Sequence, residues 1–374
     1  MSDTRTILLA GGGTGGHLYP GISVSQALRE MAPELQPLFL CTTREIDRTI
    51  LQPTGFEFIE QPIVPLSRSV GGLLRFWRGW RESKDQVRKL LEQRRPAAAL
   101  GLGGYAAGVA IKMCAQAGIP TAILNPDVIP GKANQFLMRH VSAVCCQFQQ
   151  TQDHVPPVAR GKLQVTGCPI RAEMRHLPPR DEAAKRLGLD PRLHTLVVTG
   201  ASQGALTVNE AVLETLKSVK LQGWQILHLA GKDHAEAVRA GYRELELAAV
   251  VIDFTPAMAD VWAAADLAIS RAGASSCAEL TACAVPSILL PYPFHTDMHQ
   301  RANAKVLADA GAAVLIDDQK DRRKTAAQLT PALESLLYDA KRRGEISSQA
   351  RAQGNPAAAD AVAEILRSLI RPTN

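Results

Sequence analysis

Glycine-rich turns follow strand-like runs at two places in the chain. The first, GGGTGGH at residues 11–17, follows the run 6–10, and the second, ASQGA at residues 201–205, follows the run 194–200. Glycine lets the backbone approach a ligand closely, and the helix predicted after each turn offers unpaired N–H groups and the positive end of its dipole. A single turn of this kind is explained by chain geometry alone. Two of them at equivalent strand ends indicate a ligand that carries a diphosphate, or two ligands.

A third turn, SRAGASSCAELTA at residues 270–282, leads into a predicted helix with Glu279 in its first turn. A carboxylate at this place can bind a ribose diol while the N–H groups of the turn bind phosphate. Alternatively, Glu279 only interacts with the helix dipole, or forms a capping box with Ser276. The sequence leaves both interpretations open.

Polar side chains follow the predicted strand 286–291 and fit the recognition of sugar hydroxyl groups. They are His295, Asp297, His299, Gln300 and Asn303. His295 and His299 have the i, i+4 spacing of metal ligands on a helix, but Pro293 disfavours a helix there and no third ligand is evident. We therefore predict no metal site.

The first turn also satisfies the dinucleotide pattern GxGxxG, which makes an NAD(P)-dependent dehydrogenase the alternative class of enzyme. That pattern expects an acidic residue at the end of the second strand, where this chain has Thr42, Thr43 and Arg44. Arg44 suits the 2′-phosphate of NADP. The turn also holds further glycines and His17, which the dinucleotide pattern does not require, so we rank the dehydrogenase second.

Strand-like runs alternate with helical periodicity along the whole chain. The predicted strands are 6–10, 37–42, 56–60, 97–101, 120–124 and 142–146, and then 194–200, 224–230, 248–253, 266–270, 286–291 and 312–316. This alternation predicts an α/β fold of two Rossmann-like, doubly wound domains with parallel sheets. A segment rich in Pro and Arg at 167–179 separates them. We expect domains at 1–169 and 170–354, with a C-terminal helix in 355–374 that can pack back onto the first domain.

The net charge of +6 arises in one segment of the chain. Residues 68–95 hold nine basic and three acidic side chains, and elsewhere the two kinds are equal in number. A localised positive field suits an anionic surface, and no nucleic-acid-binding motif accompanies it, so we predict no nucleic acid partner. The seven cysteines form no CxxC pair, which indicates reduced thiols in a cytosolic protein. No apolar run reaches the roughly 20 residues of a membrane span, and the start shows no signal-peptide pattern.

Six motifs, in order along the chain, resemble those of the MurG family of glycosyltransferases. They are GGTGGH (12–17), GLGGY (101–105), GCPIR (167–171), GASQGA (200–205), RAGASSCAE (271–279) and DMHQRANA (297–304). The resemblance implies a GT-B fold, in which two Rossmann-like domains face a cleft. It implies an inverting transferase, needing neither metal nor cofactor, that moves N-acetylglucosamine from UDP-GlcNAc to the C4 hydroxyl of lipid-linked N-acetylmuramoyl-pentapeptide. This is the step from lipid I to lipid II in peptidoglycan synthesis.

Such an enzyme is peripheral, at the cytoplasmic face of the cell membrane, and its acceptor is linked to a polyprenyl diphosphate. Two alternatives stay open beside the dehydrogenase. One is a transferase of the same fold with a different glycolipid acceptor, and the other is a nucleotide-binding regulator without catalysis.

The resemblance also implies roles for individual residues. On the donor side these are Thr14, Gly15, Gly16, Asp127, Arg171, Ser202, Gln203, Gly204, Thr255, Ala274, Ser275, Ser276, Cys277, Ala278, Glu279 and Gln300. Among them, Arg171 and Ser202 would hold the diphosphate, and Thr255 and Glu279 would hold the uracil and the ribose. On the acceptor side it implies His17, Tyr105 and Asn134.

His17 is the candidate general base, because an imidazole takes up a proton near neutral pH. The alternative is that His17 only shapes the turn.

One motif departs from the family. MurG sequences usually carry His-Glu-Gln-Asn after the fifth strand, where this chain reads Leu124-Asn125-Pro126-Asp127. An anionic Asp127 beside a diphosphate is unfavourable unless it pairs with a cation or acts as the base, so Asp127 is a second catalytic candidate. The departure also leaves the identity of the acceptor open.

The stretch GGLLRFWRGWR, residues 71–81, interleaves large apolar side chains with arginines. On a helix over 73–82, most of the apolar side chains share an arc of roughly 100°, as in helices that lie at a membrane surface. The candidates for membrane contact are Leu73, Leu74, Arg75, Phe76, Trp77, Arg78, Trp80 and Arg81. The alternative is that the tryptophans pack against the first sheet. An acceptor on a lipid favours the membrane.

Overall fold

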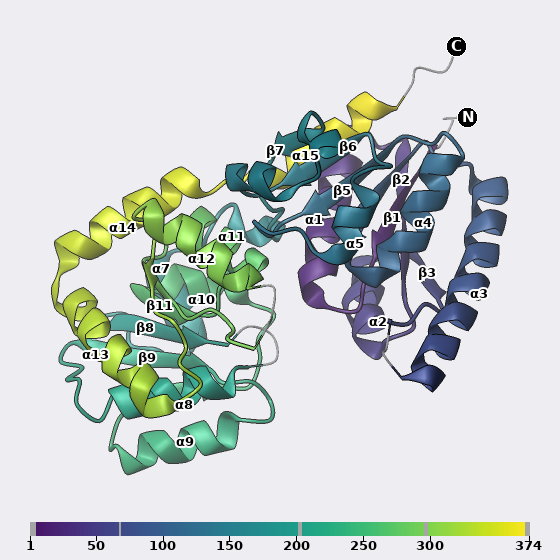
Figure 1. The fold of residues 1–374 in the computed structure, drawn as a ribbon. Helices are drawn as coiled ribbons and strands as arrows, with labels where there is room; N and C mark the ends of the chain where they lie inside the picture. The colour runs from purple at the N-terminus through teal and green to yellow at the C-terminus, as the bar shows by residue number, and fades with distance from the viewer. Residues whose placement is uncertain (1–4, 67–68, 201–203, 295–297, 371–374) are drawn as a thin grey trace. The chain divides into compact units, whose positions relative to one another are not determined.

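The computed structural model describes residues 5–66, 69–200, 204–294 and 298–370 (Figure 1). The chain forms two compact units. The first is Met1–Arg171 with Ala357–Asn374, and the second is Ala172–Pro356. Each unit contains one parallel β-sheet with helices on both faces.

The first unit contains a seven-stranded sheet in the order β3-β2-β1-β4-β5-β6-β7. Its strands are β1 (Arg5–Gly11), β2 (Leu35–Thr42), β3 (Glu57–Gln61), β4 (Ala98–Gly103), β5 (Thr121–Asn125), β6 (Ala143–Cys146) and β7 (Leu163–Val165). Its helices are α1 (Gly15–Met31), α2 (Glu45–Leu51), η1 (Gln52–Thr54), α3 (Val70–Arg94), α4 (Gly104–Gln116), α5 (Lys132–Leu137), η2 (Gln149–His154), α6 (Pro157–Arg160) and α15 (Ala358–Leu369).

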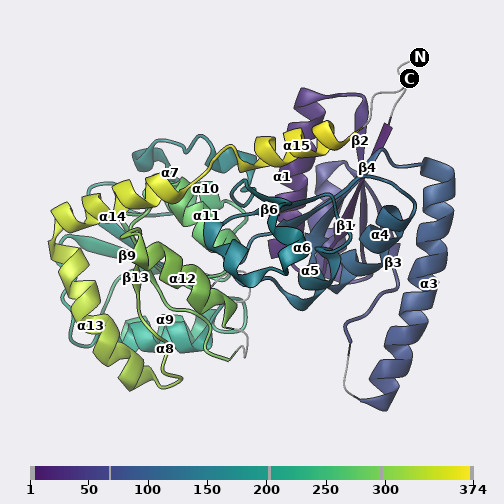
Figure 2. The same ribbon diagram turned by 45° about the horizontal axis from the view of Figure 1, so that its top comes forward.

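The central strand β1 is buried on both faces, as expected of a parallel sheet between two layers of helices. Ile7 and Leu9 belong to one apolar core, which α1 and α15 cover. Leu8 and Ala10 belong to a second core on the opposite face, which α3 and α4 cover. The last helix, α15, lies beside α1 in both ribbon views (Figures 1 and 2). The C-terminal segment therefore completes the core of the first unit.

The second unit contains a six-stranded sheet in the order β10-β9-β8-β11-β12-β13. Its strands are β8 (His194–Thr199), β9 (Trp224–Leu229), β10 (Ala249–Ile252), β11 (Leu267–Ser270), β12 (Ser287–Leu289) and β13 (Val314–Leu315). Its helices are η3 (Ala172–Met174), α7 (Arg180–Arg186), α8 (Leu206–Thr215), α9 (Ala235–Glu244), α10 (Met258–Ala264), α11 (Ala274–Ala282), α12 (His299–Asp309), α13 (Arg322–Tyr338) and α14 (Ala340–Gln353).

All twelve predicted strands are present, and two doubly wound parallel sheets confirm the predicted α/β fold class. The sequence did not predict β7. This strand lies at the edge of the first sheet, has three residues and is mostly exposed. It therefore lacks the apolar run by which a buried strand is recognised.

In each sheet the strand order reverses at one place. The reversal lies between β1 and β4 in the first unit and between β8 and β11 in the second. Proteins with open parallel sheets bind ligands in the crevice at the carboxyl ends of such strands. The turn at 11–17 follows β1 and the turn at 271–273 follows β11. The fold therefore places these two predicted turns where ligands bind.

A buried polar network in the second unit makes its stability depend on pH. His228 on β9 is fully buried, with Nδ1 2.8 Å from the Tyr242 hydroxyl and Nε2 3.1 Å from Asn209 Oδ1. Burial lowers the pKa of His228 to about 3, so the ring is neutral in the folded protein. The unfolded chain binds a proton here below a pH of about 6.5. Stability is therefore complete above that pH and falls as the pH drops toward 3.

We expect His228 alone to lower the free energy of unfolding of the second unit by about 2 kcal/mol between pH 7.5 and pH 5, measured by urea titration at each pH. The variant His228→Gln lacks the titrating group. Its free energy of unfolding should be lower than that of the wild type at every pH, but it should change less between pH 7.5 and pH 5. If the free energy of unfolding changed equally with pH in the wild type and in His228→Gln, the prediction would be wrong.

Candidate functional site

A buried carboxylate holds the first glycine turn in place. Asp47, on α2, is fully buried and accepts hydrogen bonds from Gly13 N at 2.7 Å, from Thr42 N at 2.9 Å and from the Thr42 hydroxyl at 2.7 Å. A Cβ on Gly12, whose φ is +155°, would come 2.2 Å from Asp47 Oδ2. The turn needs glycine at position 12 both for this φ and for the space that the carboxylate occupies.

The same contacts decide which N–H groups of the turn can bind phosphate. The N–H of Gly13 donates to both carboxylate oxygens of Asp47, so it faces the protein interior. The N–H groups left for an anion are those at the start of α1, after its N-cap Thr14, because the first N–H groups of a helix have no partner within it. Asp47 was not among the predicted site residues, because its position in the first turn of a short helix gave no sign of this contact.

His17 is the third residue of α1 and is partly buried. Its Nδ1 lies 3.1 Å from the carbonyl oxygen of Gly12 and 3.2 Å from the Thr14 hydroxyl. Because a carbonyl oxygen only accepts, Nδ1 carries the proton and Nε2 carries the lone pair. Burial has the largest effect on the pKa of His17 and lowers it, while the bond to Gly12 and the charges of Asp127 and Asp47 raise it. The ring is therefore a neutral base at neutral pH.

Two glycines of the GLGGY motif make room for this imidazole. A Cβ on Gly103 would come 3.1 Å from His17 Cδ2, and a Cβ on Gly104 would come 3.0 Å from His17 Cε1. Gly103 ends β4 and Gly104 begins α4, which places His17 at the reversal between β1 and β4. The resemblance placed His17 and Tyr105 of this motif together on the acceptor side, but it gave no sign that the two glycines pack against the imidazole.

A pocket of about 220 Å³ lies beside His17, and its lining includes Asn125, Asp127, Lys132 and Asn134. The buried Asn134 donates to Asn125 Oδ1 at 3.1 Å, and Asn125 donates to the carbonyl oxygen of Asp127 at 2.8 Å. These bonds shape the turn at which the chain departs from the family pattern. The structure thus brings both catalytic candidates, together with Lys132, to one pocket.

Arg44 and Tyr105 flank the glycine turn. Arg44 Nη1 donates to the carbonyl oxygen of Gly13 at 2.7 Å. A Cβ placed on Gly13 would lie 3.6 Å from both Arg44 Nη1 and the Tyr105 hydroxyl. Burial raises the pKa of Tyr105, so its hydroxyl stays protonated. Arg44 therefore stabilises the glycine turn, whereas the dehydrogenase interpretation assigned it to the 2′-phosphate of NADP.

Arg171 is the last residue of the segment Met1–Arg171 of the first unit. Its guanidinium group lies 5.0 Å from the ring centre of Tyr19 on α1. This stacking holds a positive charge near the start of α1. Like Asp47, Tyr19 was not among the predicted site residues.

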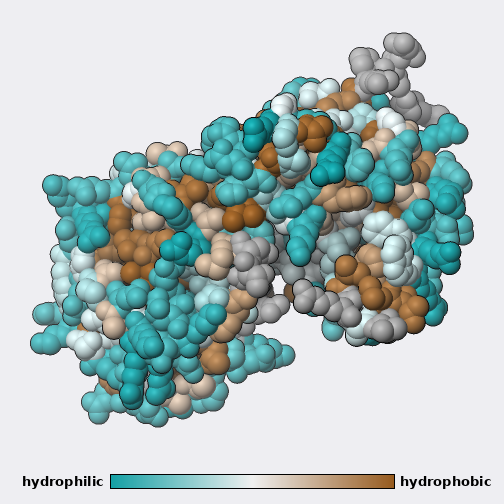
Figure 3. Space-filling model, viewed as in Figure 1, coloured by the Kyte–Doolittle hydropathy of each residue, from teal (hydrophilic) through white to brown (hydrophobic). Residues whose placement is uncertain are grey.

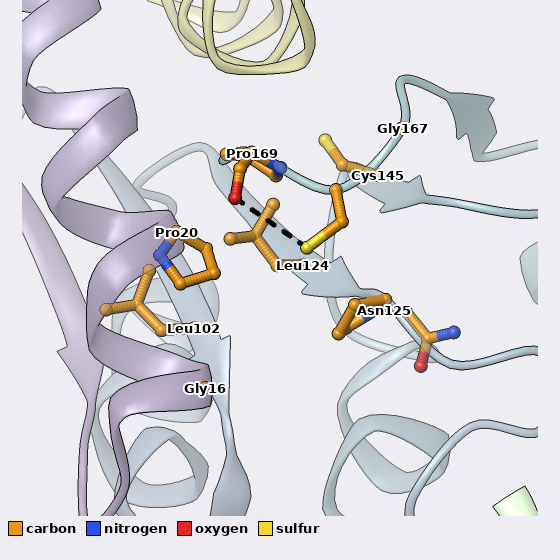
Figure 4. A pocket seen from close by; sticks show the side chains of 10 residues that line it. Gly16, Pro20, Leu102, Leu124, Asn125, Cys145, Gly167 and Pro169 are labelled. Carbon is orange, nitrogen blue, oxygen red and sulfur yellow. Dashed lines mark hydrogen bonds between the residues drawn. The ribbon is translucent and has the colours of Figure 1, made fainter. Parts of the chain in front are cut away.

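A smaller pocket, drawn in Figure 4, includes Gly16, Pro20, Leu102, Leu124 and Cys145 in its lining. Its volume of about 10 Å³ is about that of one water molecule. This pocket is too small for a substrate.

In the second unit, Glu279 is held by a tryptophan. The N-cap of α11 is Gly273, so Ser276 lies inside the helix and the alternative of a capping box with Glu279 is wrong. Instead, the buried indole of Trp262 donates to Glu279 Oε2 at 3.0 Å. Trp262 was not among the predicted site residues.

Two other predicted donor residues of this unit are Gln300, the second residue of α12, and Thr255, in the segment between β10 and α10. Gln300 Oε1 accepts from Tyr292 N at 2.9 Å, and its Nε2 lies 4.0 Å from a Cβ placed on Gly273, at the start of α11. The hydroxyl of Thr255 accepts from Ala257 N at 3.1 Å. Four polar residues named above, Ser202, Gln203, His295 and Asp297, lie outside the described residues.

A buried ion pair stabilises the turn before α11. Arg271 donates to Asp318 Oδ2 at 2.8 Å, to the carbonyl oxygen of Leu290 at 3.0 Å and to the Thr207 hydroxyl at 2.6 Å. Breaking a buried pair of this kind leaves an uncompensated charge, which is strongly destabilising. The first residue of the RAGASSCAE motif is therefore structural, and its partner Asp318 gave no signal in the sequence.

The stretch of apolar and basic residues forms the start of α3. Leu74 and Trp77 are 68% and 59% exposed, and Figure 3 shows apolar side chains gathered at this end of the unit. Trp80, in contrast, is partly buried and packs on the core covered by α4, 3.9 Å from a Cβ placed on Gly108. The packing alternative therefore holds for Trp80, whereas Trp77 is exposed, as contact with a membrane would require.

Both halves of the chain match sequence profiles of one family of known proteins. The glycosyltransferase family 28 N-terminal domain matches residues 7–146, and the glycosyltransferase family 28 C-terminal domain matches residues 195–362.

Relatives of known name align with nearly the whole chain. It is 33% identical to the UDP-N-acetylglucosamine--N-acetylmuramyl-(pentapeptide) pyrophosphoryl-undecaprenol N-acetylglucosamine transferase of Desulforudis audaxviator, over 97% of this chain and 98% of that protein. The enzyme of the same name from Halothermothrix orenii is also 33% identical, over 94% and 95% of the two chains. The crystal structure of MurG from Acinetobacter baumannii has a TM-score of 0.76 and 25% identity, over 97% of this chain and 99% of that one. The chain therefore belongs to glycosyltransferase family 28 and, within it, to the MurG family.

Proposed function

We propose that the chain transfers N-acetylglucosamine from UDP-GlcNAc to the C4 hydroxyl of lipid-linked N-acetylmuramoyl-pentapeptide, the step from lipid I to lipid II in peptidoglycan synthesis. The observation that carries this proposal is full-length similarity to transferases whose names state this reaction. Both family 28 domains support it. None of these relatives is a dehydrogenase.

A transfer assay tests the proposal. The purified chain is incubated with labelled UDP-GlcNAc, UDP-glucose or UDP-N-acetylgalactosamine, with and without polyprenyl-diphosphate-linked muramoyl-pentapeptide. We expect a labelled disaccharide lipid from UDP-GlcNAc only, and only with the acceptor. Transfer to another polyprenyl-linked glycolipid alone would show a different acceptor, and no transfer together with no UDP binding by calorimetry would exclude the proposed activity.

On the acceptor side, we assign His17 as the general base. The C4 oxygen forms a bond to C1 of N-acetylglucosamine, the bond from C1 to the diphosphate oxygen breaks, and the hydroxyl proton passes to His17 Nε2. Nε2 suits this role because Nδ1 donates to Gly12 and burial keeps the ring neutral. The pocket beside His17, with Asp127, Lys132 and Asn134 in its lining, is the proposed place of the muramoyl sugar.

On the donor side, negative charge builds up on the departing UDP. We assign its stabilisation to Arg171 and to the N–H groups at the start of the helices that follow the glycine turns. Glu279 would bind the ribose, the backbone of Thr255 the uracil, and Gln300 the transferred sugar.

We further propose that the start of α3 contacts an anionic membrane surface, which would make the chain a peripheral protein at the cytoplasmic face of the membrane. Leu74 and Trp77 are exposed, and the exposed Arg75 and Arg81 lie close to them along the helix. Apolar rings at the acyl boundary and cations at anionic head groups are typical of interfacial helices. Within the described ranges, no helix is both long and apolar enough to cross a membrane.

The double variant Leu74→Ala/Trp77→Ala is expected to bind liposomes with anionic lipids at least about tenfold more weakly, because it removes two large apolar side chains from the interface. Its UDP affinity by calorimetry should stay unchanged. Val158→Ala, at another exposed apolar residue of the same unit, serves as the matched control and should bind liposomes as the wild type does. Liposome binding unaltered in the double variant would refute the assignment.

A further inference from the structure

The bond between Trp262 and Glu279 joins two helices beside the proposed nucleoside site. Trp262, on α10, is only 2% exposed, and its indole donates to Glu279 Oε2 on α11 at 3.0 Å. An indole has a single donor and a carboxylate has two acceptor oxygens. The bond therefore fixes Oε2 toward α10 and sets the direction in which Oε1 can accept.

The helix that carries Trp262 is itself anchored at several points. The turn before α10 is closed by the Thr255 hydroxyl, which accepts from Ala257 N at 3.1 Å. Asp260 of α10 accepts from Arg186 of α7 at 2.6 and 3.1 Å. A single short helix thus connects the turn assigned to the uracil with the carboxylate assigned to the ribose.

We propose that Trp262 is a positioning residue that orients Glu279 toward the ribose diol, and that it thereby makes the site selective for ribonucleotides. The inference rests on the proposed function, because it takes a uridine nucleotide as the ligand of the second unit. A carboxylate held in one orientation before the ligand arrives loses less rotational freedom on binding than one that can turn. Trp262 acts through Glu279, so its contribution exists only when the ligand has ribose hydroxyl groups to donate.

The variant Trp262→Phe removes the indole N–H and keeps most of the apolar volume. We expect calorimetry to show UDP bound up to about tenfold more weakly than by the wild type, because Glu279, no longer held by the indole, must lose its rotational freedom when the ligand binds. Binding of 2′,3′-dideoxy-UDP, which lacks the diol, should change by less than about twofold. In the transfer assay, KM for UDP-GlcNAc should rise while kcat stays near the wild-type value.

Trp224→Phe is the matched control, since Trp224 is a second largely buried tryptophan of the same unit at 7% exposure. It should bind both nucleotides as the wild type does. If Trp262→Phe binds UDP as tightly as the wild type, Glu279 needs no support and the proposal is overturned. If it loses UDP and dideoxy-UDP equally, Trp262 only shapes the unit, which also overturns it.

Binding of UDP to the wild type is measured first, because its absence would overturn the proposed function and this inference together. Should Trp262→Phe fail to fold, the wild-type protein gives a second measurement. Its four tryptophans give four indole N–H signals in NMR spectra. Single Trp→Phe variants at the other three positions assign three of these signals, and the fourth belongs to Trp262. The Trp262 signal should move on addition of UDP and not of dideoxy-UDP, and an unmoved signal with bound UDP overturns the proposal.

Discussion

His17→Ala is expected to lower kcat for sugar transfer by at least about a hundredfold, the usual contribution of a positioned general base. The structure supplies the reason, since Nδ1 donates to the carbonyl oxygen of Gly12 and leaves the lone pair on Nε2. The affinity for UDP should stay within about twofold of the wild type, because the base acts on the acceptor hydroxyl. Initial rates at saturating acceptor, with calorimetry for UDP, measure both quantities.

The same proton transfer sets the pH dependence of the rate. Burial lowers the pKa of His17 below its ordinary value of 6.5. Since only the neutral ring accepts a proton, the rate should be constant near neutral pH and fall as the pH drops through the lowered pKa. His17→Ala should lack this acid limb. A variant that keeps the wild-type rate and the acid limb would show that His17 only shapes the turn.

Asp127→Asn is the comparison that separates the two catalytic candidates. The charge of Asp127 raises the pKa of His17, so its removal should shift the acid limb to lower pH while activity is retained. The substitution restores the amide that MurG sequences usually carry here. A loss of more than about a hundredfold would instead identify Asp127 as the base.

The second large effect is expected from Asp47→Ala. This change leaves three donors buried without the carboxylate, namely the N–H groups of Gly13 and Thr42 and the Thr42 hydroxyl. Each unsatisfied donor costs about 1 kcal/mol or more, so the free energy of unfolding of the first unit should fall by about 3 kcal/mol. Urea titration of the purified chain measures it. Transfer activity should fall as well, because the turn that Asp47 holds also supplies the Gly12 carbonyl group that orients His17.

Asp85→Ala is the matched control, since Asp85 lies in the same unit with its side chain 66% exposed and pairs only at the surface with Arg88. Its free energy of unfolding should stay within about 0.5 kcal/mol of the wild type. Similar values for the two aspartate variants would mean that the turn keeps its conformation without Asp47.

The two-domain α/β architecture could be predicted from the sequence alone. The buried strands appear as short apolar runs because both faces of a parallel sheet are covered, and this pattern is local. Glycine turns directly after β1 and β8 pointed to ligand sites for the same reason, since they lie next to their strands along the chain. The edge strand β7 was not predicted because most of its surface is exposed.

The contacts that hold the site together could not be predicted from the sequence. The carboxylate beneath the glycine turn comes from 34 residues away. The glycines against His17 come from the end of β4 and the start of α4. The indole that holds Glu279 lies on the preceding helix, and the start of α3 exposes Trp77 while it packs Trp80 inward. Periodicity and motif spacing report on neighbours along the chain. These contacts instead arise when separate elements pack, and the identity of a partner depends on which elements the sheet order brings together.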